Sequence, residues 1–135
     1  MSQATIQGTP VRGGGSKANV RQRVDQLVQY INQGRIIDAM YEFYAPDTQM
    51  QENGKPPTVG LEANVEREKQ FMAGVKEWKG FTVKALAAEG DVSFMETVAD
   101  VVTTDGTPLR VEQVSIARWR DGKIVHERFY YDSAK

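Results

Sequence analysis

The C-terminal third of the chain carries three runs of β-branched and aromatic residues, separated by tight-turn dipeptides. The runs cover residues 91–101, 109–119 and 123–132, and the gaps hold the pairs Asp105-Gly106 and Asp121-Gly122. Because Asp-Gly pairs favour the tight turns of β-hairpins, this pattern predicts three consecutive antiparallel strands.

Upstream of these strands, the hydrophobic period changes from two residues to that of a helix. Apolar residues at helical spacing predict three helices, over residues 16–31, 36–44 and 61–78. Gly34 and Pro46 end the first two, because glycine and proline interrupt helical geometry. Further strands are expected at residues 48–52 and 81–89. Helices followed by an antiparallel sheet predict an α+β fold, with the helices packed on one face of the sheet.

Length and charge restrict the classes of protein to which the chain can belong. Its 135 residues suit one domain with a core, expected over residues 16–135 behind a flexible glycine-rich arm at residues 1–15. The 17 basic and 18 acidic residues nearly balance, so neither nucleic acid nor an anionic membrane is an expected partner. The sequence has no cysteine, which excludes disulfides and thiolate ligands. It shows no signal-peptide or membrane-span pattern, so a cytoplasmic location is expected.

Period-two alternation sorts the residues of the predicted strands onto two faces. One face is expected to hold the apolar residues Val92, Phe94, Val98, Ala117, Trp119, Val125, Phe129 and Tyr131, together with Glu96, Gln113, Ser115 and Glu127. Carboxylates are unusual on the most apolar face of a sheet. This face therefore predicts a ligand pocket.

The opposite face is also too apolar to remain fully in water. It is expected to carry Met95, Ala99, Val101, Val114, Ile116, Ile124 and Tyr130, mixed with Glu112, Arg118, His126 and Arg128. Because one layer of helices covers only one side of a sheet, we expect the second face to form a homodimer interface.

Three segments resemble the SnoaL-like branch of the nuclear-transport-factor-2-like superfamily. They are Phe43-Tyr-Ala-Pro-Asp47 at the end of the helix hairpin, the helix start at Gly60, and the closing run from Trp119-Arg-Asp-Gly to Phe129-Tyr-Tyr-Asp132. The resemblance covers roughly residues 17–132 and implies a cone, in which a curved sheet wraps around three helices and encloses an internal pocket. Members of the superfamily include polyketide cyclases, ketosteroid isomerases, scytalone dehydratase, limonene epoxide hydrolase and non-catalytic binding domains.

The similarity to the ketosteroid isomerases carries over only in part. Their general-base aspartate corresponds to Glu52, which keeps a carboxylate, but their two oxyanion donors correspond to Leu27 and Ser115. A base without strong donors for the enolate oxygen lacks what is usually the largest catalytic contribution, which puts the same isomerisation in doubt. The polyketide cyclases pair an acid with a histidine, whereas His126 is expected on the opposite strand face from Glu127.

Four glutamates are the candidate acids of the pocket: Glu52, Glu96 and Glu127 for catalysis, and Glu68 of the third helix for substrate binding. Neighbouring buried carboxylates cannot all ionise cheaply, so at least one is expected to have a raised pKa and to exchange protons near neutral pH. The alternative is that Glu127 simply pairs with a neighbouring arginine and that Glu96 lies at a solvated rim.

Further residues are candidates for binding the substrate: Leu27, Asn64, Phe94, Gln113, Ser115, Trp119, Phe129 and Tyr131. The polar members could orient a ligand and the aromatic ones could line its cavity, although each could equally belong to an ordinary core. A lone histidine and a glycine run that follows no strand suggest neither a metal site nor a phosphate loop, so no metal or cofactor is expected.

Two functions remain open. The first is a cofactor-free enzyme that acts on a small hydrophobic organic molecule by acid–base catalysis, with Glu52 as the preferred base and Glu96 or Glu127 as the acid or orienting group. The second is a non-catalytic module that binds a ligand or a protein through the same cone. The pKa values of the glutamates discriminate between them, because only proton transfer requires tuned values.

Overall fold

The computed structural model of the chain describes residues 17–132, with side chains from residue 20 onward, and the expected N-terminal arm lies outside these residues. The helices are α1 (Lys17–Asn32), α2 (Ile36–Phe43) and α3 (Leu61–Ala73). The strands are β1 (Tyr44–Glu52), β2 (Thr58–Val59), β3 (Val75–Glu89), β4 (Val92–Thr103), β5 (Pro108–Arg120) and β6 (Lys123–Tyr130). This is the expected order of helices and strands, with β2 added.

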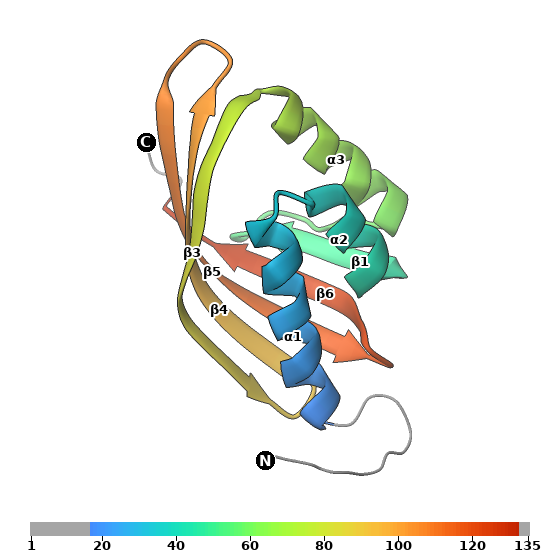
Figure 1. The fold of residues 1–135 in the computed structure, drawn as a ribbon. Coiled ribbons are helices and arrows are strands. Elements are labelled where there is room, and N and C mark those ends of the chain that lie inside the picture. The colour runs from blue at the N-terminus through green and yellow to red at the C-terminus, as the bar shows by residue number, and fades with distance from the viewer. Residues whose placement is uncertain (1–16, 133–135) are drawn as a thin grey trace.

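The strands form one curved sheet in the order β2-β1-β6-β5-β4-β3. The meander from β3 to β6 is antiparallel, as expected, whereas β1 runs parallel to β6. All three helices lie on the concave side of the sheet (Figure 1). The α+β class is confirmed, and the sheet is mixed rather than purely antiparallel.

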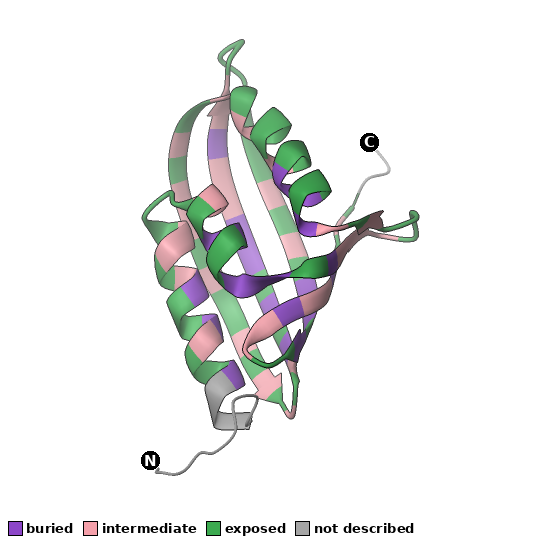
Figure 2. Cartoon of the chain, turned by 90° about the vertical axis from the view of Figure 1, so that its right-hand side faces the viewer, coloured by how far each residue is buried: buried purple, intermediate pink, exposed green. Residues whose placement is uncertain are grey.

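The core forms where the apolar sides of the helices meet the concave face of the sheet. Its most buried members include Val20, Val24 and Leu27 of α1, Ala39, Met40 and Phe43 of α2, Leu61 and Val65 of α3, and Trp119 and Ile124 of the sheet. The three positions in α1 follow the spacing of a single helix face. Figure 2 shows the same division, with buried residues on the helix sides that face the sheet.

Helix α3 ends earlier than the sequence pattern suggests. The pattern extends it to Trp78, but the helix stops at Ala73 and β3 begins at Val75. Between them, the N–H of Gly74 donates a hydrogen bond of 3.0 Å to the carbonyl of Phe71 and closes the last turn. Glycine favours the ends of helices, and the β-branched and aromatic residues that follow suit a strand.

The expected orientation of β4 is wrong by one residue. Ser93, Met95, Thr97 and Val101 face the helices and are buried, while Val92, Phe94, Glu96 and Val98 lie on the convex face. A shift of one residue in a strand moves every side chain to the other face. Because both faces of this sheet are rich in apolar residues, alternation alone does not show which face of β4 is buried.

The pairing of β4 with β5 explains why small polar residues of β4 face inward. Ser93 lies opposite Ala117, next to the large ring of Trp119. The Trp119 indole donates a hydrogen bond of 3.0 Å from Nε1 to the Ser93 hydroxyl, which satisfies both buried polar groups. Polarity at this position therefore marks a partner for tryptophan rather than exposure to solvent.

Strand β6 contains a second departure from simple alternation. Arg118 of β5 pairs with His126 of β6, but the next residue of β5, Trp119, pairs with Ile124, so the register of the strand pair shifts at this point. Such an irregularity allows two residues three positions apart to share a face. Ile124 and Glu127 are accordingly both buried, at 0% and 3% exposed, so the expected convex position of Ile124 is wrong.

We expect Trp119→Ala to lower the free energy of unfolding by about 3 kcal/mol or more, because removing a buried aromatic side chain leaves a cavity. Phe71→Ala is the matched control, since Phe71 is 43% exposed and its truncation should cost much less. Denaturant unfolding measures both. A loss below about 1 kcal/mol for Trp119→Ala would contradict its place in the core.

Candidate functional site

A cavity of about 540 Å³ lies between the helices and the concave face of the sheet. The apolar part of its wall consists of Leu27, Ile31, Ile36, Ala39, Met40, Met50, Phe71, Trp78, Phe81, Ala99, Val101, Val111 and Phe129. Polar groups enter the wall at Tyr44, Glu52, Asn64, Arg67, Glu68, Gln113 and Tyr131. The volume and the mostly apolar wall suit a small organic ligand that is oriented by a few polar groups.

Helix α3 supplies three of these polar residues from one side. Asn64, Arg67 and Glu68 lie three and four positions apart, a spacing that places them on the same face of a helix. The Asn64 side chain also fixes the start of the helix, because its Nδ2 donates to the carbonyl oxygens of Thr58 and Gly60 at 3.0 and 2.7 Å. The face that carries Arg67 and Glu68 is thereby held toward the cavity.

At the end of β1, two donors hold Glu52. Arg67 Nη2 lies 2.7 Å from its Oε2, and the Tyr131 hydroxyl donates to its Oε1. Tyr131 is positioned in turn by Asn53, whose Oδ1 accepts a hydrogen bond of 3.0 Å from the Tyr131 backbone N–H. The side chains of Arg67 and Glu52 are 48% and 32% exposed, so this cluster lies at the solvent edge of the cavity.

The pKa of Glu52 reflects these partners. Partial burial on its own would raise the pKa, but the hydrogen bonds from Tyr131 and Arg67 and the positive charge of Arg67 outweigh it and hold the pKa below its usual value. Glu52 is therefore ionised at neutral pH.

Glu127 is a buried carboxyl on β6. It lies opposite Ala117 in the sheet, and that small side chain leaves room for it. The hydroxyls of Tyr44 and Ser115 donate hydrogen bonds to it. Burial raises the pKa of Glu127 to about 7; the two hydrogen bonds oppose this rise, and the nearby charge of Glu68 adds to it.

Glu68 interacts electrostatically with both Glu52 and Glu127. Burial raises its pKa, the charge of Arg67 works in the opposite direction, and the charge of Glu52 adds to the rise. The pKa is thus lowered for Glu52 and raised for Glu68 and Glu127, although the three carboxyls lie close enough to interact. When neighbouring carboxyls have different pKa values, one can act as an acid and another as a base.

The profile of the SnoaL-like domain family matches residues 24–127. The chain belongs to this family. A provisionally named SnoaL-like polyketide cyclase from Mesorhizobium loti has a similar structure, with a TM-score of 0.70 and 23% identity over 83% of this chain and 98% of its own. An NTF2-like protein of unknown function from Burkholderia pseudomallei has a TM-score of 0.74 and 14% identity over 86% and 92% of the two chains.

A provisionally named isomerase from Bacillus subtilis is also similar, with a TM-score of 0.71 and 17% identity over 85% of this chain and 87% of its own. Identities this low show a common fold. No curated protein matches the chain in sequence.

In this SnoaL-like domain, most of the candidate residues lie together. Leu27, Glu52, Asn64, Glu68, Gln113, Phe129 and Tyr131 line the cavity. Glu127 and Ser115 are buried and are not among the described residues of the wall, and Glu127 is hydrogen-bonded to Tyr44. Trp119 belongs to the core, and Phe94 lies on the convex face with Glu96, so the expected inward orientation of these two β4 residues is wrong.

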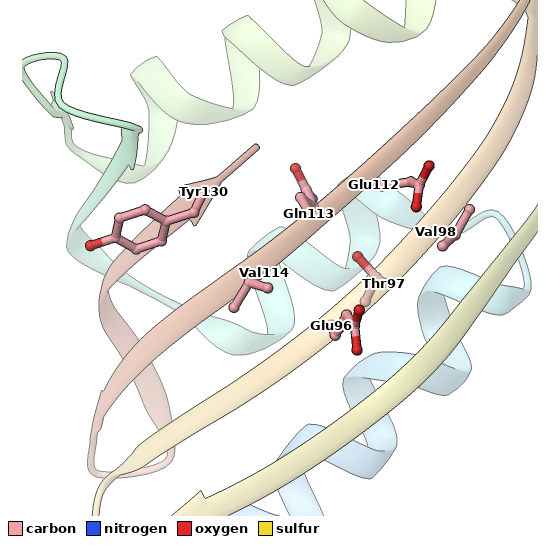
Figure 3. Close-up of a pocket in the computed structure, with 7 residues that line it drawn as sticks. All are labelled: Glu96, Thr97, Val98, Glu112, Gln113, Val114 and Tyr130. Atoms are coloured by element: carbon pink, nitrogen blue, oxygen red, sulfur yellow. The ribbon is translucent and has the colours of Figure 1, made fainter. Parts of the chain in front are cut away.

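Glu96 instead borders a second, smaller cavity of about 170 Å³ on the convex face. The cavity is lined by Glu96, Thr97, Val98, Glu112, Gln113, Val114 and Tyr130 (Figure 3). Glu96, Val114 and Tyr130 face one another across three neighbouring strands. The sheet therefore separates Glu96 from the other three glutamates.

Two polar residues of this SnoaL-like site, Arg67 and Tyr44, were not among the sequence candidates. Arg67 could have been found from its helical spacing to Asn64 and Glu68. Tyr44 has no comparable local signal, because its hydroxyl meets Glu127 only through the pairing of two strands that are distant in the sequence.

Within residues 17–132, no group of three His, Asp or Glu side chains is placed to hold a metal ion. Nor does the same range contain a helix that is long and apolar enough to cross a membrane.

Glu127 should make stability depend on pH. Its pKa is higher in the folded state than the usual 4.5, so its contribution is full below about pH 4.5 and is lost as the pH rises through about 7. Relative to Glu127→Gln, the wild-type free energy of unfolding should fall by about 3 kcal/mol over this range.

Denaturant unfolding of both proteins at several pH values measures this difference, and the titration of Glu68 is common to both. Glu66→Gln, an exposed change on α3, serves as the control and should follow the wild type. If the difference in free energy of unfolding between the wild type and Glu127→Gln did not change with pH, the pKa of Glu127 would not be raised in the folded protein.

Proposed function

We propose that the chain binds a small hydrophobic organic molecule in the inner cavity and transforms it by acid–base catalysis with its own side chains. The observation that carries this proposal is the presence of Glu52 and Glu68 in the wall of a mostly apolar cavity of about 540 Å³. A carboxyl in such surroundings can exchange protons with a bound carbon acid at near-neutral pH.

The two carboxyls are suited to different parts of the reaction. Glu68 has a raised pKa, so that its ionised form is the stronger base, and we assign it the proton transfer. Both oxygens of Glu52 are engaged by Arg67 and Tyr131, which suits the orientation of a ligand at the cavity edge. Glu52, the base preferred from the sequence, thus becomes the orienting group, and Glu68 takes its place.

The names of two similar structures are compatible with this chemistry. The proteins from Mesorhizobium loti and Bacillus subtilis are provisionally named as a polyketide cyclase and an isomerase. Both reaction types can proceed by proton transfer at carbon next to a carbonyl group. The rival function is a non-catalytic module, which would keep the cavity and its ligand but perform no proton transfer.

The test uses 2-tetralone, a bicyclic ketone with acidic C–H groups. Trp78 lines the cavity, so binding should quench tryptophan fluorescence. In D₂O, the wild type should accelerate incorporation of deuterium next to the carbonyl, measured by mass spectrometry. Glu68→Gln should still bind but exchange at least roughly 100-fold more slowly, the usual contribution of a general base.

Two controls make the experiment specific. Ala99→Trp fills the cavity and should abolish binding, whereas Ala87→Trp places the same ring at an exposed position of β3 outside the cavity wall and should leave binding intact. Binding without accelerated exchange would favour the non-catalytic module. Failure of 2-tetralone to bind would contradict the proposed ligand class.

We also propose that two copies associate through the convex face of the sheet. Phe94, Val114 and Tyr130 are 39%, 39% and 41% exposed there, an unusual gathering of large apolar side chains on a surface. Along β5, Glu112 lies on one side of this apolar centre and Arg118 lies on the other. A two-fold axis through the centre would bring acids of one copy onto bases of the other.

Ile116→Glu should dissociate this homodimer, because it would bring two poorly solvated like charges together near the axis. Val59→Glu is the control, since Val59 is 63% exposed on β2. Light scattering at micromolar concentration measures the mass of each protein. A monomeric wild type, or a dimeric Ile116→Glu variant, would contradict the proposed interface.

A further inference from the structure

Tyr44 stands between Glu127 and the cavity. It lines the cavity wall, and its hydroxyl donates a hydrogen bond to Glu127. Glu127 is 3% exposed and is not among the described residues that form the wall. Among the described residues, Tyr44 is thus the wall residue that is hydrogen-bonded to Glu127.

The protonation state of Glu127 decides what Tyr44 can offer to a ligand. A phenol has one hydrogen to donate and lone pairs that accept, whereas an ionised carboxylate only accepts. When Glu127 is ionised, the Tyr44 hydrogen is committed to it, and the cavity is left with an acceptor. When Glu127 carries a proton on the facing oxygen, it can donate to Tyr44 and release the Tyr44 hydrogen toward the cavity.

We propose that Tyr44 is the contact for the oxygen atom of the ligand and that Glu127, without touching the ligand, sets whether Tyr44 donates or accepts. This assignment rests on the proposed function and narrows its ligand class. With Glu127 neutral, the cavity selects an apolar ligand that carries a carbonyl oxygen. It also supplies a donor that the ketosteroid-isomerase positions, here Leu27 and Ser115, do not provide.

The surrounding charges allow both states near neutral pH. Burial raises the pKa of Glu127 to about 7, and burial with the nearby charge of Glu127 keeps the pKa of Tyr44 well above its usual value, so Tyr44 stays protonated. From α3, Glu68 acts on both groups, and Arg67 and Glu52 act on Glu68. Ser115, from β5, is neutral. Because Glu68 also titrates, the test must separate it from Glu127.

The test compares 2-tetralone with tetralin, the hydrocarbon of the same skeleton, at about pH 6 and about pH 8, on either side of the Glu127 pKa of about 7. The Kd of the ketone for the wild type should rise about fivefold at the higher pH, the loss of one typical hydrogen bond, while that of tetralin stays constant. Tyr44→Phe should bind each compound with the same Kd at both pH values.

Glu127→Gln is the decisive variant, because its amide can donate to Tyr44 at any pH. It should bind the ketone at the higher pH as tightly as the wild type does at the lower pH. Glu68→Gln should keep the pH dependence. A dependence that vanishes in Glu68→Gln and persists in Glu127→Gln would overturn the assignment to Glu127.

The remaining outcomes separate this inference from the function on which it rests. If both compounds bind the wild type and neither Kd responds to pH, or if tetralin responds as the ketone does, the assignment of Tyr44 and Glu127 fails while binding in the cavity stands. If neither compound binds, the proposed function fails as well.

Discussion

The parallel pairing of β1 with β6 is the constraint on which the site depends. It joins the segment that follows the helix hairpin to the last strand of the meander, and it places Glu52 beside Phe129. Through it Tyr44 reaches Glu127 at one end of β1 and Tyr131 reaches Glu52 at the other. Without this pairing, these polar groups would not meet.

Glu52, Glu68 and Glu127 differ in their contact with water. Glu52 is partly exposed and paired with an arginine, so it ionises easily, whereas Glu127 is buried, accepts hydrogen bonds from two hydroxyl groups and resists ionisation. Glu68 lies between them in environment. One family of folds can therefore host different chemistries by placing the same residue type at different depths, which is why the fold alone does not fix the reaction.

Local patterns in the sequence were enough to predict the helices, the meander and the α+β class, because hydrophobic period and turn dipeptides act over a few residues. The faces of β4 were not predictable in this way, since Ser93 is buried as a partner of Trp119. The inward position of Ile124 depends on a register shift in its strand pair. Cavity residues of α3 such as Glu68 followed from helical spacing, whereas the contact of Tyr44 with Glu127 required long-range pairing.

Helix α2 passes directly into β1, because Phe43 is the last residue of the helix and Tyr44 is the first of the strand. The Tyr44 N–H still donates to the Met40 carbonyl, so the phenol is attached to the final turn of the helix with no loop to absorb movement. Any tilt of α2 is consequently a displacement of Tyr44. A change in the packing of the helix hairpin would therefore also change the position of the Tyr44 hydroxyl.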